Sequence, residues 1–226
     1  MYLLALDTAT NSGGVALARN AELVGLVMIK RPLEYSERIL DYVDLVLRQF
    51  DLQPSDLDCF VAAVGPGSFT GLRIGIATVK GFAQCLDRPV VGVSSLAALA
   101  FRFRHVAGRV SPMMDARRQQ VFAGLFEVSE TEVRSLRDER ACPPAEWLHS
   151  LPPEPCLCVG DGAQMYASMI AGLRPQDRIL RTDNAILPEL CRLGYEAYIR
   201  GESTTPDRLT ANYLRPADAE QARADT

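Results

Sequence analysis

A glycine-rich turn between two apolar segments is the part of this sequence best suited to bind a charged group. The segment Gly-Pro-Gly-Ser-Phe-Thr-Gly-Leu-Arg-Ile-Gly at 65–75 follows an apolar run at 59–64 and leads into a proline-free, aliphatic stretch at 72–86. This pattern predicts a buried strand, a tight turn and a helix. Gly65 and Gly67 allow backbone angles that a Cβ atom would forbid.

Two chemical roles are open for this turn. Ser68 or Thr70 would cap the helix, and the free N–H groups around the helix N-terminus would suit a phosphate or a carboxylate. Alternatively, the glycines serve packing alone. Gly71, Gly75 and Thr78 recur at about one-turn spacing and would give the helix a flat face that another helix could approach closely. The two roles are compatible with each other.

The elements that must position this turn occur twice along the chain. In each half a strand ends in an aspartate (Asp7, Asp115), and a later strand runs into Val-Gly-x-Gly before a helix (at 64–67 and 159–162). This order predicts a duplicated α/β domain with mixed sheets, divided near residues 107 and 108. We expect a first half at 1–107, a second and shorter half at 108–215, and a disordered tail at 216–226, which has no large apolar residue.

The first predicted half has a βββαβαβα order, and the second half repeats most of it. Expected strands in the first half are 2–6, 13–19, 23–29, 59–64 and 90–93, and expected helices are 36–50, 72–86 and a segment ending near residue 103. In the second half the expected strands are 109–114, 119–128, 132–136 and 156–159, and the expected helices are 146–150, 164–171 and 188–200. An extended segment at 211–216 would close the fold.

Composition argues against several classes of function. The chain has 226 residues, 48% of them hydrophobic, and a net charge of −4 from 24 basic and 28 acidic residues. A protein that binds RNA strongly on its own would more often be basic. No apolar run is long enough to span a membrane, and the first residues lack the basic region of a signal peptide. We therefore expect a cytoplasmic protein without membrane contact.

Histidine and cysteine are poorly placed for a metal site. The two histidines, His105 and His149, are far apart in sequence, and the six cysteines show no CxxC spacing. Cys156 and Cys158 alternate along a predicted strand, so a shared metal there is the weaker interpretation. We expect reduced, buried cysteines and no metal site.

Several of these segments together resemble the TsaB (YeaZ) family of bacterial tRNA threonylcarbamoyladenosine biosynthesis proteins. The segments are Leu4–Thr10, the turn at 65–75, Gly92–Leu96, Met114–Arg117 and Tyr213–Arg215. The resemblance spans nearly the whole chain and implies a duplicated actin-like, heat-shock-ATPase-like fold. It also implies a role in forming N6-threonylcarbamoyladenosine in tRNAs that read codons beginning with A.

The resemblance further implies that the chain is a scaffold without a catalytic centre. In this family TsaB pairs with its paralogue TsaD, which holds the metal and catalyses the transfer, and the ATPase TsaE joins them. The complex would use ATP and Mg²⁺, and this chain would hold no cofactor of its own. It would contact tRNA only as part of the complex. Catalytic paralogues carry an H-x-x-x-H pair on the helix matching 36–50, where this chain has no histidine. A free-standing ATPase or kinase, and less readily a peptidase, are the alternatives.

The carboxylates at the strand ends admit two interpretations. In actin-like ATPases such acids help to orient Mg-nucleotide or water; otherwise each would cap its own turn. We expect a vestigial nucleotide or anion site, because Asn11-Ser12 lacks a lysine and Asp161 would repel a phosphate. The candidate residues are Asp7, Thr8, Gly65, Gly67, Ser68, Thr70 and Asp115.

Partner binding is assigned to the two long helices of the first half. A small, apolar face would serve a homodimer when the chain is alone and the TsaD heterodimer in the cell. The candidate residues are Ile39, Val43, Val46, Leu47, Gly71, Gly75, Thr78 and Phe82, some of which must face the sheet. A basic group of residues is either a solvated surface or a contact to tRNA phosphates; it comprises Arg102, Arg104, His105, Arg109, Arg117 and Arg118.

Overall fold

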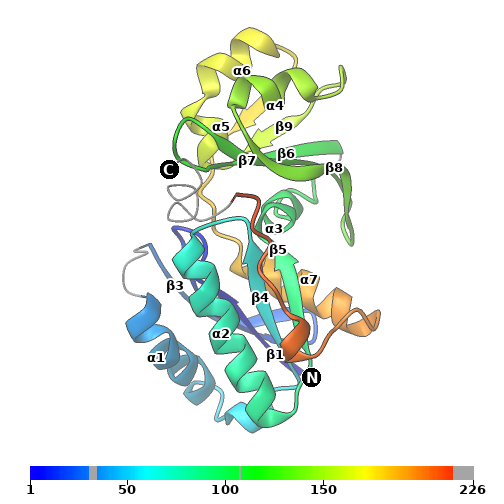
Figure 1. Ribbon diagram of the computed structural model, residues 1–226. Helices are drawn as coiled ribbons and strands as arrows, with labels where there is room; N and C mark the ends of the chain where they lie inside the picture. Colours follow the sequence, from blue (N-terminus) through cyan, green and yellow to red (C-terminus); the bar gives the residue numbers. More distant parts are fainter. Residues whose placement is uncertain (31–34, 107, 216–226) are drawn as a thin grey trace.

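Two five-stranded mixed sheets form the framework of the protein, which the computed structural model describes over residues 1–30, 35–106 and 108–215 (Figure 1). The first sheet contains β1 (Tyr2–Asp7), β2 (Gly13–Arg19), β3 (Glu22–Ile29), β4 (Cys59–Gly65) and β5 (Val90–Ser94). The second contains β6 (Gly108–Asp115), β7 (Val121–Val128), β8 (Val133–Cys142), β9 (Leu157–Val159) and β10 (Arg178–Leu180). The predicted tail at 216–226 lies outside the described residues.

The two sheets have the same topology. Their strand orders are β3-β2-β1-β4-β5 and β10-β9-β6-β7-β8. In each sheet the first three strands form an antiparallel meander, and the last two add in parallel beside the first strand. The predicted duplicated α/β fold is confirmed by this correspondence, since β1 to β5 match β6 to β10 in order and direction.

The helices also follow the repeat. They are α1 (Tyr35–Arg48), α2 (Phe69–Leu86), α3 (Ser95–Phe101), α4 (Pro144–Ser150), α5 (Asp161–Met165), α6 (Ala167–Leu173) and α7 (Leu187–Ile199), with short 3₁₀ turns at Pro54–Asp56 and Pro206–Arg208. β1 shows why the sheets are covered on both faces. Leu4 and Leu6 belong to the cluster under α1 and α2, whereas Leu3 and Ala5 belong to the cluster with α3 and α7. Alternate residues of one strand thus enter two different cores.

The last helix of each half packs against the sheet of the other half. α3 contacts β6, β7 and β8, and α7 contacts all five strands of the first sheet (Figure 1). The ideal Cβ position of Gly194 on α7 lies 2.4 Å from Val61 Cγ2 on β4, which shows how closely α7 is seated. The second sheet begins at Gly108, and α7, which belongs to the predicted second half of 108–215, packs on the first sheet.

Smaller differences from the predicted elements have local causes. α2 begins at Phe69 rather than 72, because the Ser68 side chain accepts a hydrogen bond from the Gly71 N–H and caps the helix there. β8 extends to Cys142, well beyond the predicted 132–136, since its charged residues face solvent at a sheet edge. The three-residue strand β10 was not predicted, and the helix expected at 164–171 is divided at Tyr166 into α5 and α6.

Candidate functional site

The carboxylate of Asp7 is turned inward and closes its own turn. The residue is fully buried. Its Oδ1 accepts hydrogen bonds from the Ala9 N–H at 2.8 Å and the Thr10 N–H at 3.2 Å, and its Oδ2 accepts one from the Thr10 hydroxyl at 2.5 Å. Burial raises the pKa of Asp7 to about 6, although these three hydrogen bonds oppose the increase. Both oxygens are therefore committed to the turn that follows β1.

The glycine face of α2 packs against the same turn. The Thr8 hydroxyl donates a hydrogen bond to the Gly71 carbonyl at 2.6 Å. A Cβ atom added to Gly71 would lie 1.9 Å from the Thr8 carbonyl oxygen, and one added to Gly75 would lie 2.5 Å from the Thr8 Oγ1. The predicted use of Gly71 and Gly75 in a subunit interface was wrong, because the end of β1 already occupies this face.

The apolar face of α1 is likewise internal. Ile39, Val43, Val46 and Leu47 are each 2–3% exposed and pack on the first sheet. They cannot contact a partner, which corrects their assignment to an interface. On α2, the Thr78 hydroxyl donates to the Ile74 carbonyl, and Phe82 stacks on Phe60 with ring centroids 5.7 Å apart.

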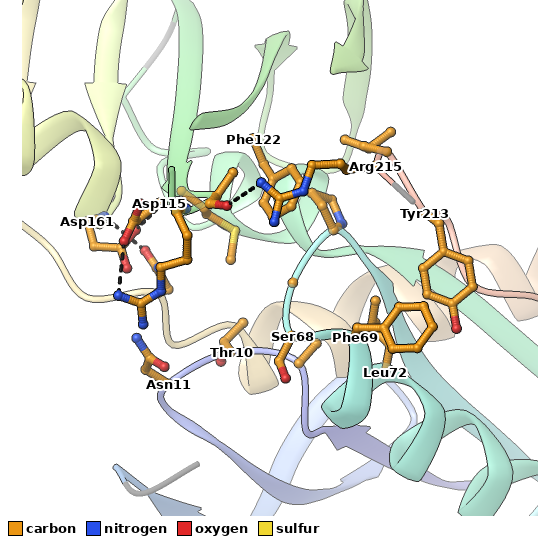
Figure 2. Close-up of a pocket in the computed structure, with 18 of the residues that line it drawn as sticks. Thr10, Asn11, Ser68, Phe69, Leu72, Asp115, Phe122, Asp161, Tyr213 and Arg215 are labelled. Atoms are coloured by element: carbon orange, nitrogen blue, oxygen red, sulfur yellow. Dashed lines mark hydrogen bonds and ion pairs between the residues drawn. The ribbon is translucent and has the colours of Figure 1, made fainter. Parts of the chain in front are cut away.

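A cavity of about 760 Å³ lies between the two halves (Figure 2). Four of the predicted site residues line it: Gly67, Ser68 and Thr70 from the first half and Asp115 from the second. Asp7, Thr8 and Gly65 are not part of its lining. Residues that the sequence analysis did not assign to a site complete the lining, among them Thr10, Asn11, Phe122, Asn184, Asn212 and Tyr213.

The second-half wall of the cavity contains two carboxylates, each of which accepts a backbone hydrogen bond. The Asp161 carboxylate accepts a hydrogen bond from the Asp115 N–H at 2.9 Å, and the Asp115 carboxylate accepts one from the Arg117 N–H at 2.8 Å. Arg117 Nη1 lies 3.3 Å from Asp115 Oδ2. Arg117, Arg118 and Gln119 follow with φ of 63°, 50° and 59°, three consecutive left-handed residues. This conformation is uncommon for residues other than glycine.

A C-terminal segment, residues 209–215, runs from the first half across the cavity to the second; we call it the strap. The Asn212 N–H donates to the Val64 carbonyl at 2.7 Å, and the Tyr213 ring lies 4.8 Å from the Phe69 ring. Farther along, Arg215 Nη1 donates to the Ala116 carbonyl at 2.8 Å. Figure 2 shows Tyr213 above Phe69 and Arg215 reaching toward the turn after β6. Residues 211–215 of the extended segment predicted at 211–216 thus border the site, and residue 216 lies outside the described residues.

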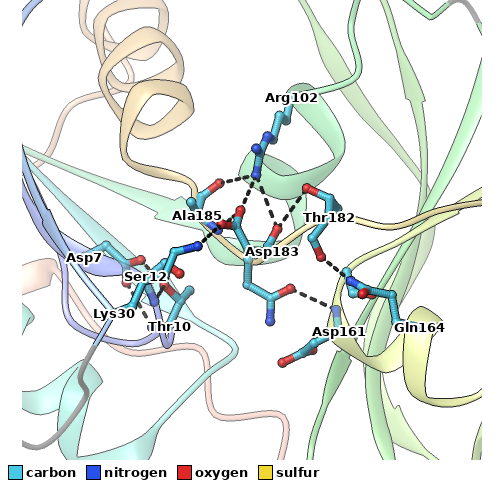
Figure 3. Close-up of polar contacts among 12 residues, drawn as sticks. Asp7, Thr10, Ser12, Lys30, Arg102, Asp161, Gln164, Thr182, Asp183 and Ala185 are labelled. Atoms are coloured by element: carbon cyan, nitrogen blue, oxygen red, sulfur yellow. Dashed lines mark hydrogen bonds and ion pairs between the residues drawn. The ribbon is translucent and has the colours of Figure 1, made fainter.

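The basic residues near the junction of the halves are mostly paired with acids. Asp183 accepts from Arg102 at 2.8 Å and contacts Lys30 at 2.9 Å, and these two cations hold the pKa of Asp183 at about 2 (Figure 3). Arg109 lies 2.5 Å from Glu154. Two further basic residues, Arg104 and His105, lie 4.0 Å from Glu189 and Glu130 respectively. Four of the six residues in the predicted basic group thus lie within 4.0 Å of a carboxylate, namely Arg102, Arg104, Arg109 and Arg117.

Two other kinds of site are absent from the part of the chain that the structure describes. Over residues 1–30, 35–106 and 108–215, no three His, Cys, Asp or Glu side chains are grouped so that they could hold a metal ion. Within the same ranges no helix is long and apolar enough to cross a bilayer.

The duplicated sheets, the exchange of the last helix between the halves and the cavity between them define an actin-like α/β fold. Fold comparison supports this class: the ROK hexokinase of Thermus thermophilus superimposes with a TM-score of 0.52 at 12% identity, over 89% of this chain and 100% of that one. At that identity the likeness concerns the fold alone. YeaZ from Pseudomonas aeruginosa superimposes with a TM-score of 0.81 at 30% identity, over 94% of this chain and 99% of that chain.

Sequence comparison places the chain within this class. Residues 32–169 match the family model of TsaD, tRNA N6-adenosine threonylcarbamoyltransferase. The tRNA threonylcarbamoyladenosine biosynthesis protein TsaB of Bacillus subtilis (strain 168) is 34% identical over 225 residues, covering 97% of this chain and 96% of that protein. The chain belongs to the TsaB family.

Proposed function

We propose that this chain is a non-catalytic partner subunit in the formation of N6-threonylcarbamoyladenosine in tRNAs that read codons beginning with A. It pairs with a TsaD-type transferase, is joined by the TsaE ATPase and meets tRNA in the cytoplasm through the complex. Its named relatives and its match to the TsaD family model support this proposal. ATP and Mg²⁺ are used by the complex, and the chain needs no cofactor of its own.

The burial and hydrogen bonding of the Asp7 carboxylate are the observation that supports a non-catalytic role. A carboxylate that acts on Mg-nucleotide must present an oxygen to the ligand. Here the side chain is fully buried, and its oxygens accept three hydrogen bonds from Ala9 and Thr10. This geometry is that of a residue stabilising a turn, in agreement with the capping interpretation.

The docking surface is the outward side of α1 and α2, which lie side by side on the first sheet (Figure 1). Leu40 and Leu45 on α1 are 59% and 48% exposed, which is high for large apolar side chains. On α2 the outward residues include Arg73, Ala77 and Gly81. An ideal Cβ atom at Gly81 meets nothing within 4 Å, so a partner helix could approach the backbone closely there.

Gly81 allows the docking surface to be tested without disturbing the fold. Gly172 on α6 is a matched control, because it is also an exposed helical glycine with no atom within 4 Å of its ideal Cβ position. We expect Gly81→Arg to weaken binding to the TsaD-type partner by about tenfold or more, while Gly172→Arg leaves binding unchanged. Titration calorimetry with the purified partner measures this. Equal effects of the two substitutions would exclude the α1–α2 surface.

Reconstitution of threonylcarbamoyl transfer tests the function itself. Modified tRNA should form when this chain is combined with the TsaD-type transferase and the TsaE ATPase, and should fall to background when the chain is left out. The isolated chain should hydrolyse ATP negligibly. Transfer that does not depend on the chain, or ATP turnover by the chain alone that Asp7→Asn abolishes, would favour a free-standing ATPase or kinase instead.

A further inference from the structure

Arg73, on the outward side of α2, is held in place by two aromatic side chains. Its guanidinium carbon lies 3.9 Å from the centre of the Phe69 ring, within the range of a cation–π contact. The Arg73 Nε–H donates a hydrogen bond to the Tyr213 hydroxyl at 3.3 Å, and the Tyr213 ring lies 4.8 Å from that of Phe69. A long side chain that would otherwise sample many rotamers is therefore restrained at the surface.

The strap that carries Tyr213 is anchored to both halves. The Asn212 N–H bonds to the Val64 carbonyl of the first half, and the Asn212 side-chain amide donates to Glu139 Oε2 on β8 at 3.1 Å. On the other side of the tyrosine, Arg215 donates to a carbonyl of the turn after β6. These bonds on either side of Tyr213 keep its ring and hydroxyl in position against α2.

The contacts of Arg73 leave its charge without an acidic partner. Over the described residues, the Tyr213 hydroxyl is its one hydrogen-bond acceptor, and no carboxylate lies within salt-bridge distance. By contrast, Arg102, Arg109 and Arg117 each lie close to an aspartate or a glutamate. The Nη1 and Nη2 groups of an arginine form a planar fork that matches the two oxygens of a carboxylate. An arginine that is restrained but unpaired loses little freedom on binding an acid from outside the chain.

Arg73 also lies within the proposed docking surface. It shares the exposed stripe of α2 with Ala77 and Gly81, at intervals of four residues. A rise of about 1.5 Å per residue puts Arg73 about 12 Å from Gly81 along the helix axis. A partner helix that approaches closely at Ala77 and Gly81 would therefore bring one of its side chains to the Arg73 fork.

On the basis of the proposed function, we propose that Arg73 binds an aspartate or glutamate side chain of the TsaD-type transferase, and that the strap holds Arg73 ready for this contact. The pair is charge-assisted and bidentate, which makes it stronger and more directional than a neutral hydrogen bond. Tyr213 is a positioning residue, because it acts on the partner through Arg73.

A carboxylate suits this place better than the phosphates of tRNA. α1 packs beside α2 and exposes Asp41 and Asp44. Repeated phosphates would meet these acids, whereas a single acidic side chain on a partner helix need not. The net charge of −4 favours the same choice.

Titration calorimetry with the purified transferase, without tRNA, tests the role of Arg73. We expect Arg73→Gln to weaken binding by about tenfold or more. Arg73→Lys should recover only part of the loss, because an ammonium group keeps the charge but lacks the planar fork. Arg178→Gln is the matched control and should leave binding unchanged. Arg178 is an exposed arginine on β10 of the second sheet, and no carboxylate of the described residues lies within salt-bridge distance of it.

A double-mutant cycle tests the role of the strap. Tyr213→Leu should weaken binding by about threefold to tenfold in the wild-type chain and have no effect in a chain with Arg73→Gln. Tyr213→Phe keeps the ring beside Phe69 and should cost less than Tyr213→Leu. Additive losses would show that Tyr213 acts independently of Arg73, and would overturn its positioning role.

The acid itself is found by changing exposed acids of the transferase to their amides, one at a time. One such change should weaken binding to the wild-type chain as much as Arg73→Gln does, and cause no further loss against the Arg73→Gln chain. If none behaves in this way, or if Arg73→Gln weakens binding only when tRNA is present, the carboxylate contact is overturned.

Failure of the docking surface would be a distinguishable result, because Gly81→Arg would then leave transferase binding intact. If Gly81→Arg weakens binding while Arg73→Gln behaves like Arg178→Gln, the docking surface stands and the proposed contact of Arg73 is wrong.

Discussion

The turns after β1 and β6 occupy equivalent places in the two sheets, yet they differ in their relation to the cavity. Asp7 is fully buried and bonds only within its own turn. Asp115 lines the cavity and contacts Arg117, and its backbone N–H donates a hydrogen bond to the Asp161 carboxylate. The same topology therefore holds one sealed carboxylate and one that faces the space between the halves.

One position in the glycine turns accounts for much of this difference. In Val-Gly-x-Gly the variable residue is Pro66 in the first half and Asp161 in the second. Asp161 accepts the Asp115 N–H and keeps the second turn polar. In the first half α2 continues for 18 residues, and its glycines bring it against Thr8. The duplicated framework thus keeps its strand order, while the turn after β1 is covered by a helix and the turn after β6 faces the cavity.

The largest expected effect comes from filling the contact between α2 and the first turn. Gly71→Ala would place a Cβ atom 1.9 Å from the Thr8 carbonyl oxygen, so the backbone must move, and we expect a loss of about 3 kcal/mol or more in the free energy of unfolding. Gly162→Ala in the second half meets the Met113 carbonyl oxygen at 2.8 Å and should cost less, about 1–2 kcal/mol. Urea denaturation of both variants compares them, and equal losses would show that the two turns are packed alike.

Removing the charge of Asp7 should have a smaller effect that depends on pH. The folded-state pKa of about 6 is above the ordinary value of 3.8, so the stability that this group contributes is present below about pH 4 and is lost as the pH rises through 6. Asn at this position keeps an acceptor for the Ala9 and Thr10 N–H groups and does not titrate. At pH 8 we expect Asp7→Asn to be more stable than the wild type by roughly 2–3 kcal/mol.

Thermal unfolding between pH 4 and pH 8 measures this difference, which should shrink toward the acidic end. Asp115→Asn is the control in the second half, where loss of a partly solvated ion pair with Arg117 should cost about 1 kcal/mol or less. An Asp7→Asn chain that is folded but no longer supports threonylcarbamoyl transfer would show that the sealed carboxylate has a chemical role after all.

Local sequence signals were enough to predict the repeat and most of its elements. The strand at 13–19 was predicted with the bounds that the structure has, because its short apolar run ends at Arg19 and is followed by the turn at Asn20. The short strand β10 carries too little pattern to be recognised in three residues. The charged end of β8 resembles a loop in sequence, since an edge strand with a solvated face needs few apolar residues.

The site was harder to predict because its contacts join distant parts of the chain. The apolar stripe of α1 was recognised, but such a stripe is the face that a helix buries against its own sheet. The face left for docking is the opposite, exposed side of the helix. The salt bridge between Arg102 and Asp183 spans 81 residues, and the hydrogen bond between Arg215 and Ala116 spans 99. No periodicity connects such pairs, so the strap and its place beside the cavity emerged only from the tertiary structure.

The smallest expected effect concerns how the open turn after β6 is held. Gln119 is exposed and adopts φ of 59°, which a side chain with a Cβ atom rarely does. Glycine relieves that strain but adds freedom to the unfolded chain, so Gln119→Gly should gain only about 0.5 kcal/mol. Gln119→Ala is the matched control, because alanine keeps the Cβ atom and should gain nothing. The urea midpoints of the two variants measure this difference. A glycine variant no more stable than the alanine variant would mean that the turn beside Asp115 relaxes in solution. The second-half turn would then be held by the strap and Asp161 rather than by its own backbone conformation.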